Sequence, residues 1–390
     1  MPDRPVVLHQ GIYKKTATVG EAVFMITGMT IGAGILGVPY VVAQVGLVVG
    51  LVYILVLGIV MLYLNLIIGE TAVRTGENLQ LPGLAGKYLG PWAKGVVSAI
   101  AIFTGYGALL AYMVGEGQAI AALIGGDPLI WSFFFWSVGS FLIWRGLQTV
   151  KTVERILSLS VMIIITGLSV YLLRGFHPAV WTHFNTAKMF LPFGVILFAL
   201  NAAPAIAEAH ALLPGSQRHF KKAVILGTMI PVVLYLLFTL AVVGVTNGAT
   251  TEVATVGLGQ MFGPVVLIFA NVFAILAMGT AFMGMGMALK QIFIWDYKMP
   301  KWVADVMVVI APLGLFAWGV RGFVEILDAI GGIFVSLGSI ILVLACYKAR
   351  KKSELTADRY SLQWFGPIAV AVIAVFTFVM VYSIVKLFIK

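Results

Sequence analysis

The sequence has few charged residues and a single cysteine. Only 10% of its 390 residues are Asp, Glu, Lys or Arg, whereas a soluble domain carries about 25%. With Cys346 as its one cysteine, the chain can form neither an intramolecular disulfide nor a cysteine-based metal cluster. Its five histidines lie outside the middle of the apolar runs, which argues against haem or a buried zinc ion. We therefore expect no metal and no cofactor.

Apolar residues, by contrast, make up 61% of the chain, and the mean hydropathy is +1.05. A helix needs about 20 apolar residues to cross the hydrocarbon of a bilayer. This pattern predicts an all-α integral membrane protein with one membrane domain, residues 1–390, in the cell membrane. Eleven transmembrane helices are predicted, at about 19–43, 47–72, 93–124, 128–145, 153–174, 188–210, 220–245, 263–293, 301–318, 322–346 and 364–387.

The basic residues predict how these spans are oriented. If the N-terminus is cytoplasmic, only five of the 25 Lys and Arg residues fall on the outer side, namely Arg174, Lys188, Arg321, Lys386 and Lys390. Such a bias is the positive-inside rule. We therefore expect the C-terminus outside, and the net charge of +10 then requires no nucleic-acid partner. The expected partner of these spans is the lipid bilayer.

The first span contains an unusual stretch, "TGMTIGAGILG" (27–37), with four glycines. Each glycine weakens a helix by about 1 kcal/mol relative to alanine. One interpretation is close helix packing, because Gly28 and Gly32 form a small-xxx-small pattern. The other is a discontinuous helix whose unwound backbone lines a binding site.

The sixth span carries a matching interruption in "LFALNAAPAIAEAH" (197–210). Asn201 and Pro204 lie near its middle, and Pro204 has no N–H to bond residue 200. Paired interruptions in corresponding helices are typical of inverted-repeat transporters. The pair predicts a five-plus-five inverted repeat with discontinuous helices 1 and 6. Repeat one covers about 19–174, repeat two about 188–346, and an extra eleventh helix about 364–387.

Three motifs resemble known permeases. "GMTIGAGILGVPYVVAQVG" (28–46) resembles the first helix of the amino acid/auxin permease and aromatic amino acid permease families, within the amino acid–polyamine–organocation superfamily. "GENLQLPGLAGKYLGPW" (76–92) is similar to their loop between helices 2 and 3, and "LDAIGGIFVSLGSIILVL" (327–344) to their tenth helix. The resemblance covers most of the chain and implies an amino acid transporter.

A free amino acid presents a carboxylate and an ammonium group. Free N–H groups at the start of a half-helix near Gly34 suit the carboxylate, because that helix end carries positive dipole. The resemblance implies the same cradle, formed by Thr30, Ile31, Gly32, Ala33 and Gly34. Carbonyl groups of the sixth span would accept the ammonium group, around Ala199, Leu200 and Asn201.

The pocket for the substrate's side chain is expected from the third, sixth and eighth spans. The candidates are Phe103, Tyr106, Tyr112, Phe198, Ala202, Ala203 and the run "MGTAFMGMGM" (278–287). Close helix packing is the other interpretation of that methionine- and glycine-rich run. We expect an apolar or aromatic L-amino acid as substrate. Small neutral amino acids such as alanine are the alternative substrates.

Glu116, in "MVGEGQA", is the most deeply placed ionisable residue of the predicted spans. An acid at such depth is a functional hypothesis by default, and it suits a proton carrier. Alternatively, it faces an outer aqueous vestibule or bonds a neighbouring helix. We expect secondary active import by symport, with protons as the coupling ion.

Sodium coupling is the alternative that the resemblance implies. Relatives with this fold bind sodium between the first break and helix 8, where Gly28, Ile31 and Thr280 would lie. The sodium-coupled branch commonly has an asparagine near Gly28, which is absent here. Some proton-coupled relatives have a lysine on helix 5, which is also absent.

Other classes of protein fit the sequence less well. An enzyme would need a nucleophile–base pair or metal ligands at membrane depth, and a channel would need filter loops or charged rings. Neither pattern is found, so we expect no enzyme. The remaining alternative is transport or exchange of another small solute on the same fold, such as an amine, a nucleobase or a metal ion.

Overall fold

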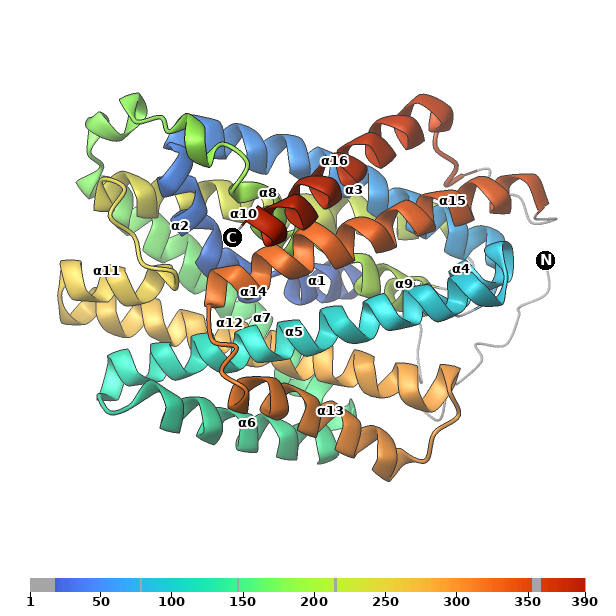
Figure 1. The fold of residues 1–390 in the computed structure, drawn as a ribbon, viewed down its shortest axis with the longest axis horizontal. Helices are drawn as coiled ribbons and strands as arrows, with labels where there is room; N and C mark the ends of the chain where they lie inside the picture. The colour runs from blue at the N-terminus through green and yellow to red at the C-terminus, as the bar shows by residue number, and fades with distance from the viewer. Residues whose placement is uncertain (1–17, 78, 146, 214–215, 353–358, 390) are drawn as a thin grey trace.

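The structure is a computed structural model that describes residues 18–77, 79–145, 147–213, 216–352 and 359–389. These residues form sixteen α-helices joined by short 3₁₀ and π turns, and no strand occurs among them (Figure 1). The all-helical prediction is therefore confirmed for the described part of the chain.

The first half of the chain consists of α1 (Val19–Thr30), α2 (Gly34–Val45), α3 (Leu47–Thr75), α4 (Leu81–Leu89), α5 (Pro91–Ile124), α6 (Pro128–Arg145) and α7 (Leu147–Leu172). The second half consists of α8 (Pro192–Ala199), α9 (Ala203–Leu212), α10 (Gln217–Thr246), α11 (Ala254–Phe262), α12 (Pro264–Gln291), α13 (Lys301–Ala317), α14 (Phe323–Ala329), α15 (Ser336–Lys352) and α16 (Phe365–Ile389). A π turn, Ile330–Val335, joins α14 to α15.

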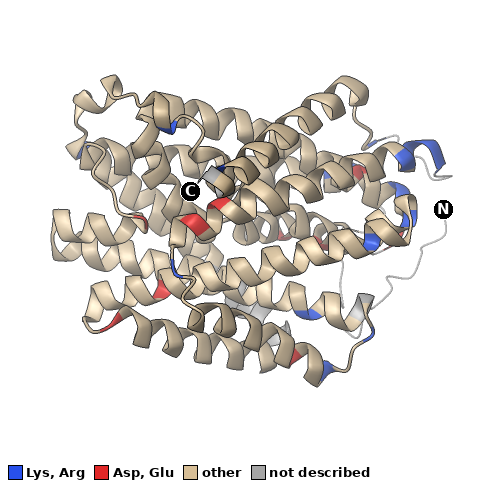
Figure 2. Cartoon of the chain, in the orientation of Figure 1, with Lys and Arg blue, Asp and Glu red and all other residues tan. Residues whose placement is uncertain are grey.

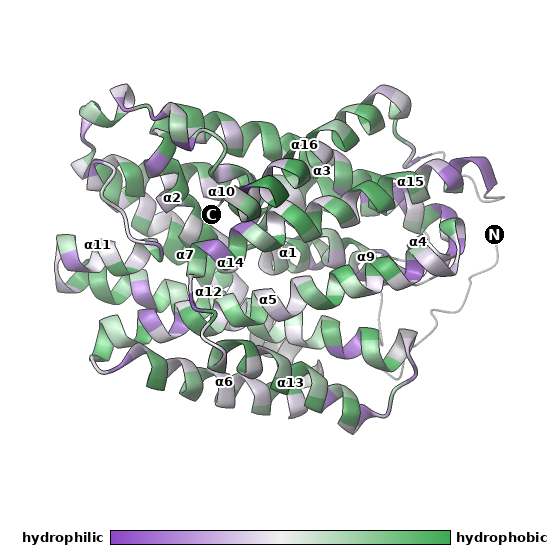
Figure 3. Ribbon diagram, in the orientation of Figure 1, coloured by the Kyte–Doolittle hydropathy of each residue, from purple (hydrophilic) through white to green (hydrophobic). Residues whose placement is uncertain are grey.

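Eight segments of the described residues are long and apolar enough to cross a membrane, and the bent pair α1 and α2 makes a ninth if it counts as one span. The two other predicted spans coincide with α6, which has 18 residues, and α13, which has 17. Apolar residues run along the middle of the helices (Figure 3). The chain is thus built as a multi-span membrane protein.

Long helices surround the two interrupted spans. The helices α1 and α2 pack against α10, and α2 also packs against α8. On the other side, α12 packs against α5, α7 and α1. The short helix α4 packs on α5 and α15 at one end of the bundle, where many of the Lys and Arg residues gather (Figure 2).

Ion pairs tie distant helices together inside this bundle. Glu70 of α3 is fully buried and accepts hydrogen bonds from Arg74 at 2.8 Å and from Arg350 of α15 at 2.5 Å. Lys290 of α12 pairs with Asp305 of α13, and both residues are buried. These pairs fix the ends of the helices that frame the site.

Candidate functional site

The first predicted span is broken where the glycines lie. The helix α1 ends at Thr30 and α2 begins at Gly34, with a bend of 54° between them. The last bond of α1 runs from the Ile31 N–H to the Thr27 carbonyl, at 2.9 Å. In the described part of the chain, no backbone carbonyl accepts from the N–H of Ala33 or Gly34. The predicted break is therefore confirmed, and it leaves two free donors at the start of α2.

The sixth span is interrupted as well. The helix α8 ends at Ala199 and α9 begins at Ala203, so Leu200–Ala202 lies between them. Pro204 has no N–H to offer the Leu200 carbonyl, and no backbone N–H of the described residues donates to the carbonyl of Leu200 or Asn201. The Asn201 side-chain oxygen accepts from the Ala203 N–H at 3.3 Å. This break thus leaves two free carbonyls.

The two breaks lie against each other. A Cβ added at Gly34 would overlap the backbone of Ala199, so only glycine lets α2 and α8 approach this closely. Tyr235 of α10 links the two breaks, because its hydroxyl lies 3.0 Å from the Ala199 carbonyl and 3.3 Å from the Thr30 carbonyl.

Two further helices, α12 and α5, pack against the first break. A Cβ at Gly32 would lie 2.8 Å from the Ala281 Cβ of α12 and 3.2 Å from the Tyr112 hydroxyl of α5. The predicted cradle residues Thr30, Ile31 and Ala33 are all buried. The Thr30 side-chain hydroxyl donates to the Ile26 carbonyl at 2.7 Å, so the Thr30 side chain is already paired.

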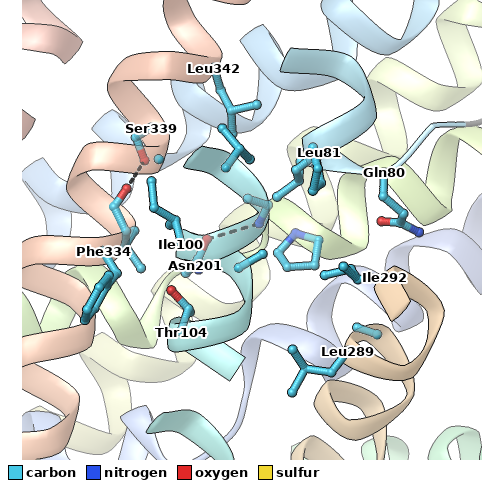
Figure 4. Close-up of a pocket in the computed structure, with 18 of the residues that line it drawn as sticks. Gln80, Leu81, Ile100, Thr104, Asn201, Leu289, Ile292, Phe334, Ser339 and Leu342 are labelled. Carbon is cyan, nitrogen blue, oxygen red and sulfur yellow. Dashed lines mark hydrogen bonds between the residues drawn. The ribbon is translucent and has the colours of Figure 1, made fainter. Parts of the chain in front are cut away.

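A cavity of about 70 Å³ reaches the second break (Figure 4). Its lining comes from α5, α9, α12, α15, the residues at the start of α4, the second break itself and the π turns Ile292–Asp296 and Ile330–Val335. Its polar lining residues are Gln80, Thr104, Asn201 and Ser339. Of the residues predicted to bind substrate, Asn201 lines this cavity, and the pocket candidates Ala203 and Met285 line it too.

The other pocket candidates lie elsewhere. Tyr106 and Phe198 are not part of the cavity lining, and Phe198 and Ala202 are buried in the core. Phe103 lies on the outer surface, 57% exposed, and stacks on Phe334 with ring centroids 5.5 Å apart. The expectation for Phe103 is therefore not met, because the side of α5 that carries it faces out of the bundle.

Glu116 lies inside α5 with its side chain fully buried. Neither carboxylate oxygen has a hydrogen-bond partner in the described part of the chain. Gly279 of α12 lies beside it, because a Cβ added there would lie 3.5 Å from one carboxylate oxygen. In this conformation Glu116 thus neither faces an aqueous vestibule nor bonds a neighbouring helix, and its role as a proton carrier stays a prediction.

The residues expected to hold sodium lie around one narrow gap. Gly28 and Ile31 of the first break face Thr280 of α12, and Ser158 and Val161 of α7 complete the lining. The gap holds no space for a water molecule. The Thr280 hydroxyl donates to the Leu276 carbonyl at 2.6 Å. Its oxygen can still accept, so these groups offer oxygen ligands without any charged side chain.

A sequence model of the tryptophan/tyrosine permease family matches residues 15–384. The chain belongs to this family. Of the two families that its motifs resemble, the aromatic amino acid permeases are therefore the matching one. Membership of a permease family also confirms that the chain is a transporter and not an enzyme.

Three proteins with similar sequences are named as amino acid transporters. Glutamine transporter 2 of Aliivibrio fischeri is 25% identical over 350 residues, which cover 84% of this chain and 88% of that protein. Tyrosine-specific transport system 1 of Haemophilus influenzae is 23% identical, with coverage of 86% and 88%. Its tyrosine-specific transport system 2 is 25% identical, with coverage of 81% and 84%.

The fold of the permease resembles that of a solved transporter. The crystal structure of MhsT in complex with L-phenylalanine superposes with a TM-score of 0.69 and 15% identity, over 95% of this chain and all of that one. At this identity the likeness extends to the fold alone.

Sequence reasoning missed two residues of the site. Tyr235 lies in the apolar run "VVLYLLF" (232–238), and a buried tyrosine hydroxyl there needs a hydrogen-bond partner. A tyrosine within an apolar run is therefore a signal that could have identified Tyr235 from the sequence. Ser158 gave no signal, because single serines are common in membrane helices and its partners lie on other spans.

Proposed function

We propose that this permease imports an apolar or aromatic L-amino acid across the cell membrane by ion-coupled symport. Small neutral amino acids are the alternative substrates, because they carry the same carboxylate and ammonium groups. The observation that carries the proposal is the contact between the two breaks at Gly34 and Ala199. The first break carries the free N–H groups, and the second carries the free carbonyls. The names of the relatives, two tyrosine systems and a glutamine transporter, support the amino acid class.

The two breaks would hold the two charged ends of the substrate. The N–H groups of Ala33 and Gly34, at the positive end of α2, suit a carboxylate. The carbonyls of Leu200 and Asn201 suit an ammonium group, which has three donors and no acceptor. Thr30, Ile31 and Gly32 complete the cradle through their backbone, and no charged side chain is needed.

The proposed architecture places this site between two repeats. Five helices, about 19–174, and five helices, about 188–346, form an inverted pair, and the eleventh span lies outside it. The span count is supported by α6 and α13, which coincide with the two predicted spans that are shorter than the rest. The gathering of basic residues at one end supports a cytoplasmic N-terminus and an outer C-terminus (Figure 2). Alternating access would follow from rocking of one bundle against the other.

Protons are the proposed coupling ion, with Glu116 as their carrier. An ionised carboxylate is costly to bury without a partner, and Glu116 is buried without one in the described part of the chain. The neutral acid is the form that such surroundings tolerate. A cycle that opens this region to water would allow the proton to leave.

Sodium coupling is the second candidate, and one observation favours it. Gly28, Ile31, Ser158 and Thr280 line a common gap, and neutral oxygen atoms of this kind are ligands for hard cations. Transport of an amine, nucleobase or metal ion on the same fold is the remaining alternative. The gap and both breaks lack the acidic or sulfur ligands that a transported metal would favour, apart from Met29.

Ion-driven uptake tests the coupling. Purified permease in proteoliposomes would be given labelled L-tyrosine or L-leucine under an imposed proton gradient, an imposed sodium gradient, or neither. We expect accumulation with the inward proton gradient. Accumulation driven by sodium alone would instead identify sodium as the coupling ion, with the gap around Thr280 as its binding site.

A further inference from the structure

An ion pair joins α16 to α14 at the start of the tenth predicted span. The Lys386 ammonium group of α16 lies 2.6 Å from a carboxylate oxygen of Asp328 in α14. Both residues belong to segments that are apolar enough to cross a membrane, and their side chains are only 32% and 14% exposed. An ionisable residue within a membrane span is costly and is usually paired. The pair is therefore a specific contact between the tenth and eleventh spans.

Asp328 lies against α8, the first half of the interrupted sixth span. A Cβ added at Gly194 of α8 would overlap both the carboxylate and the backbone of Asp328. A Cβ added at Gly331, in the π turn after α14, would overlap the Gly194 carbonyl and lie 2.7 Å from the Phe198 nitrogen. The π turn and α8 thus pack backbone against backbone, so a displacement of one must displace the other.

The helix α16 also packs directly on this junction between the π turn and α8 (Figure 1). A Cβ added at Gly332 of the π turn would overlap the Ser383 hydroxyl of α16. The Phe378 ring of α16 lies 5.5 Å from the Phe190 ring and 5.9 Å from the Phe193 ring, between centroids. Phe190 precedes α8, and Phe193 lies in its first turn. The eleventh span therefore supports both sides of the junction.

The second break follows directly after this junction. The helix α8 ends at Ala199, and the free carbonyls of Leu200 and Asn201 come next in the chain. On the other side, the π turn departs from α-helical bonding, and the Ser336 hydroxyl donates to the Gly331 carbonyl, five residues earlier, at 3.2 Å. Such π turns within helices occur frequently at functional sites. The position of α8 against the π turn therefore sets where the free carbonyls lie.

We propose that the eleventh span positions the binding site for the substrate's ammonium group, with Asp328 and Lys386 as its positioning residues. The ion pair holds the π turn in place, and the π turn holds α8 and the carbonyls that follow it. Without the pair, the π turn and α8 shift together, and the carbonyls fit the ammonium group less well. The inference rests on the proposed binding of an amino acid at the second break. It assigns a role in binding to a span outside the two proposed repeats.

Uptake kinetics in proteoliposomes test the ion pair. Uptake of labelled L-tyrosine, or of the amino acid that wild-type permease prefers, would be measured for Lys386→Gln, Asp328→Asn and the double variant. We expect each single variant to raise the KM about fivefold, the factor that one partly exposed ion pair can supply, at an unchanged maximal rate per folded protein. The double variant should show no further rise, because the pair is already broken. Lys386→Arg, which keeps the charge, should behave as wild type, and so should the control Lys87→Gln, which breaks the exposed pair with Glu77.

A second set of variants tests the contact between α16 and the π turn by size. Gly332→Ala places a methyl group against Ser383 and should raise the KM in the same way. Adding Ser383→Gly should lower the KM again, because it removes the side chain that the methyl group would overlap. Gly366→Ala is the control on α16, since a Cβ there meets no atom within 4 Å.

The split between KM and maximal rate separates positioning from stability. A contact that only stabilises the fold would lower the amount of folded permease and hence the maximal uptake, and would leave the KM unchanged. An unchanged KM in Lys386→Gln, with wild-type uptake intact, would overturn the positioning role alone. A double variant whose KM rises by the product of the two single effects would overturn it too. Failure of folded wild-type permease to move any amino acid would overturn the proposed function as well.

Discussion

The hydroxyl of Tyr235 lies 3.0 Å from the carbonyl of Ala199, at the point where the second broken helix stops. The same hydroxyl lies 3.3 Å from the carbonyl of Thr30, where the first broken helix stops. A single hydroxyl proton can be donated to only one of these carbonyls at a time. Tyr235 thus joins the two halves of the site through a contact that can shift from one half to the other.

Replacing Tyr235 with Phe should slow transport. The change removes one hydrogen bond, worth about 1 kcal/mol, and leaves the carbonyls of both breaks without this donor. We expect the uptake rate to fall about fivefold, with the protein still inserted in the membrane. Tyr297→Phe, at an exposed position, is the control. Uptake by Tyr235→Phe at the wild-type rate would remove this contact from the mechanism.

Gly32→Leu should abolish uptake. A Cβ at Gly32 would lie 2.8 Å from the Cβ of Ala281, so the larger side chain must push α12 away from the first break. Gly314→Leu on α13 is the matched control, because a Cβ there meets no atom within 4 Å. Membrane insertion would be checked by the yield of folded protein. Retained transport by an inserted Gly32→Leu variant would contradict the binding role of the break.

Glu116→Gln should remove the pH dependence of transport. If the buried acid carries the proton, wild-type uptake rises as the external pH falls, because protonation returns the neutral form. Glutamine is always neutral, so the variant should show a flat profile and lose accumulation driven by a proton gradient. Glu77→Gln, whose side chain is 61% exposed, should behave as wild type. A pH profile that survives Glu116→Gln would exclude Glu116 as the carrier.

The buried pair of Lys290 and Asp305 makes a separate prediction about stability. Asp305→Ala leaves the Lys290 ammonium buried, with the Ile143 carbonyl at 3.2 Å as a remaining partner. Breaking a buried pair in this way costs about 3–5 kcal/mol, so the melting temperature in detergent should fall. The double variant Lys290→Met with Asp305→Leu should recover most of the loss. Equal melting temperatures for Asp305→Ala and wild type would show that the pair is not energetically coupled.

The breaks could be predicted from the sequence because their causes are local. Glycines at 28, 32 and 34 weaken the first helix whatever surrounds it, and Pro204 removes a helical hydrogen bond by its own covalent structure. The structure accordingly ends α1 at Thr30 and begins α2 at Gly34. Long apolar runs likewise predicted the spans, since their length is set by the bilayer and not by other helices.

The remainder of the site depends on contacts between distant segments. Tyr235 meets a carbonyl 205 residues away and another 36 residues away, and no local pattern encodes either contact. In a helix that is apolar on all sides, the face that lies outward cannot be deduced from periodicity. For this reason the sequence predicts Phe103 in the pocket, whereas in the structure its neighbour Thr104 lines the cavity.

Counterflow exchange tests the central claim most directly. Proteoliposomes containing the permease would be loaded with one unlabelled L-amino acid at a time and diluted into labelled L-tyrosine without ion gradients. We expect transient accumulation of label in vesicles loaded with aromatic or large apolar L-amino acids, and none with the D-isomers. Absence of exchange with every L-amino acid, from protein shown to be folded, would contradict the claim that the paired breaks bind an amino acid.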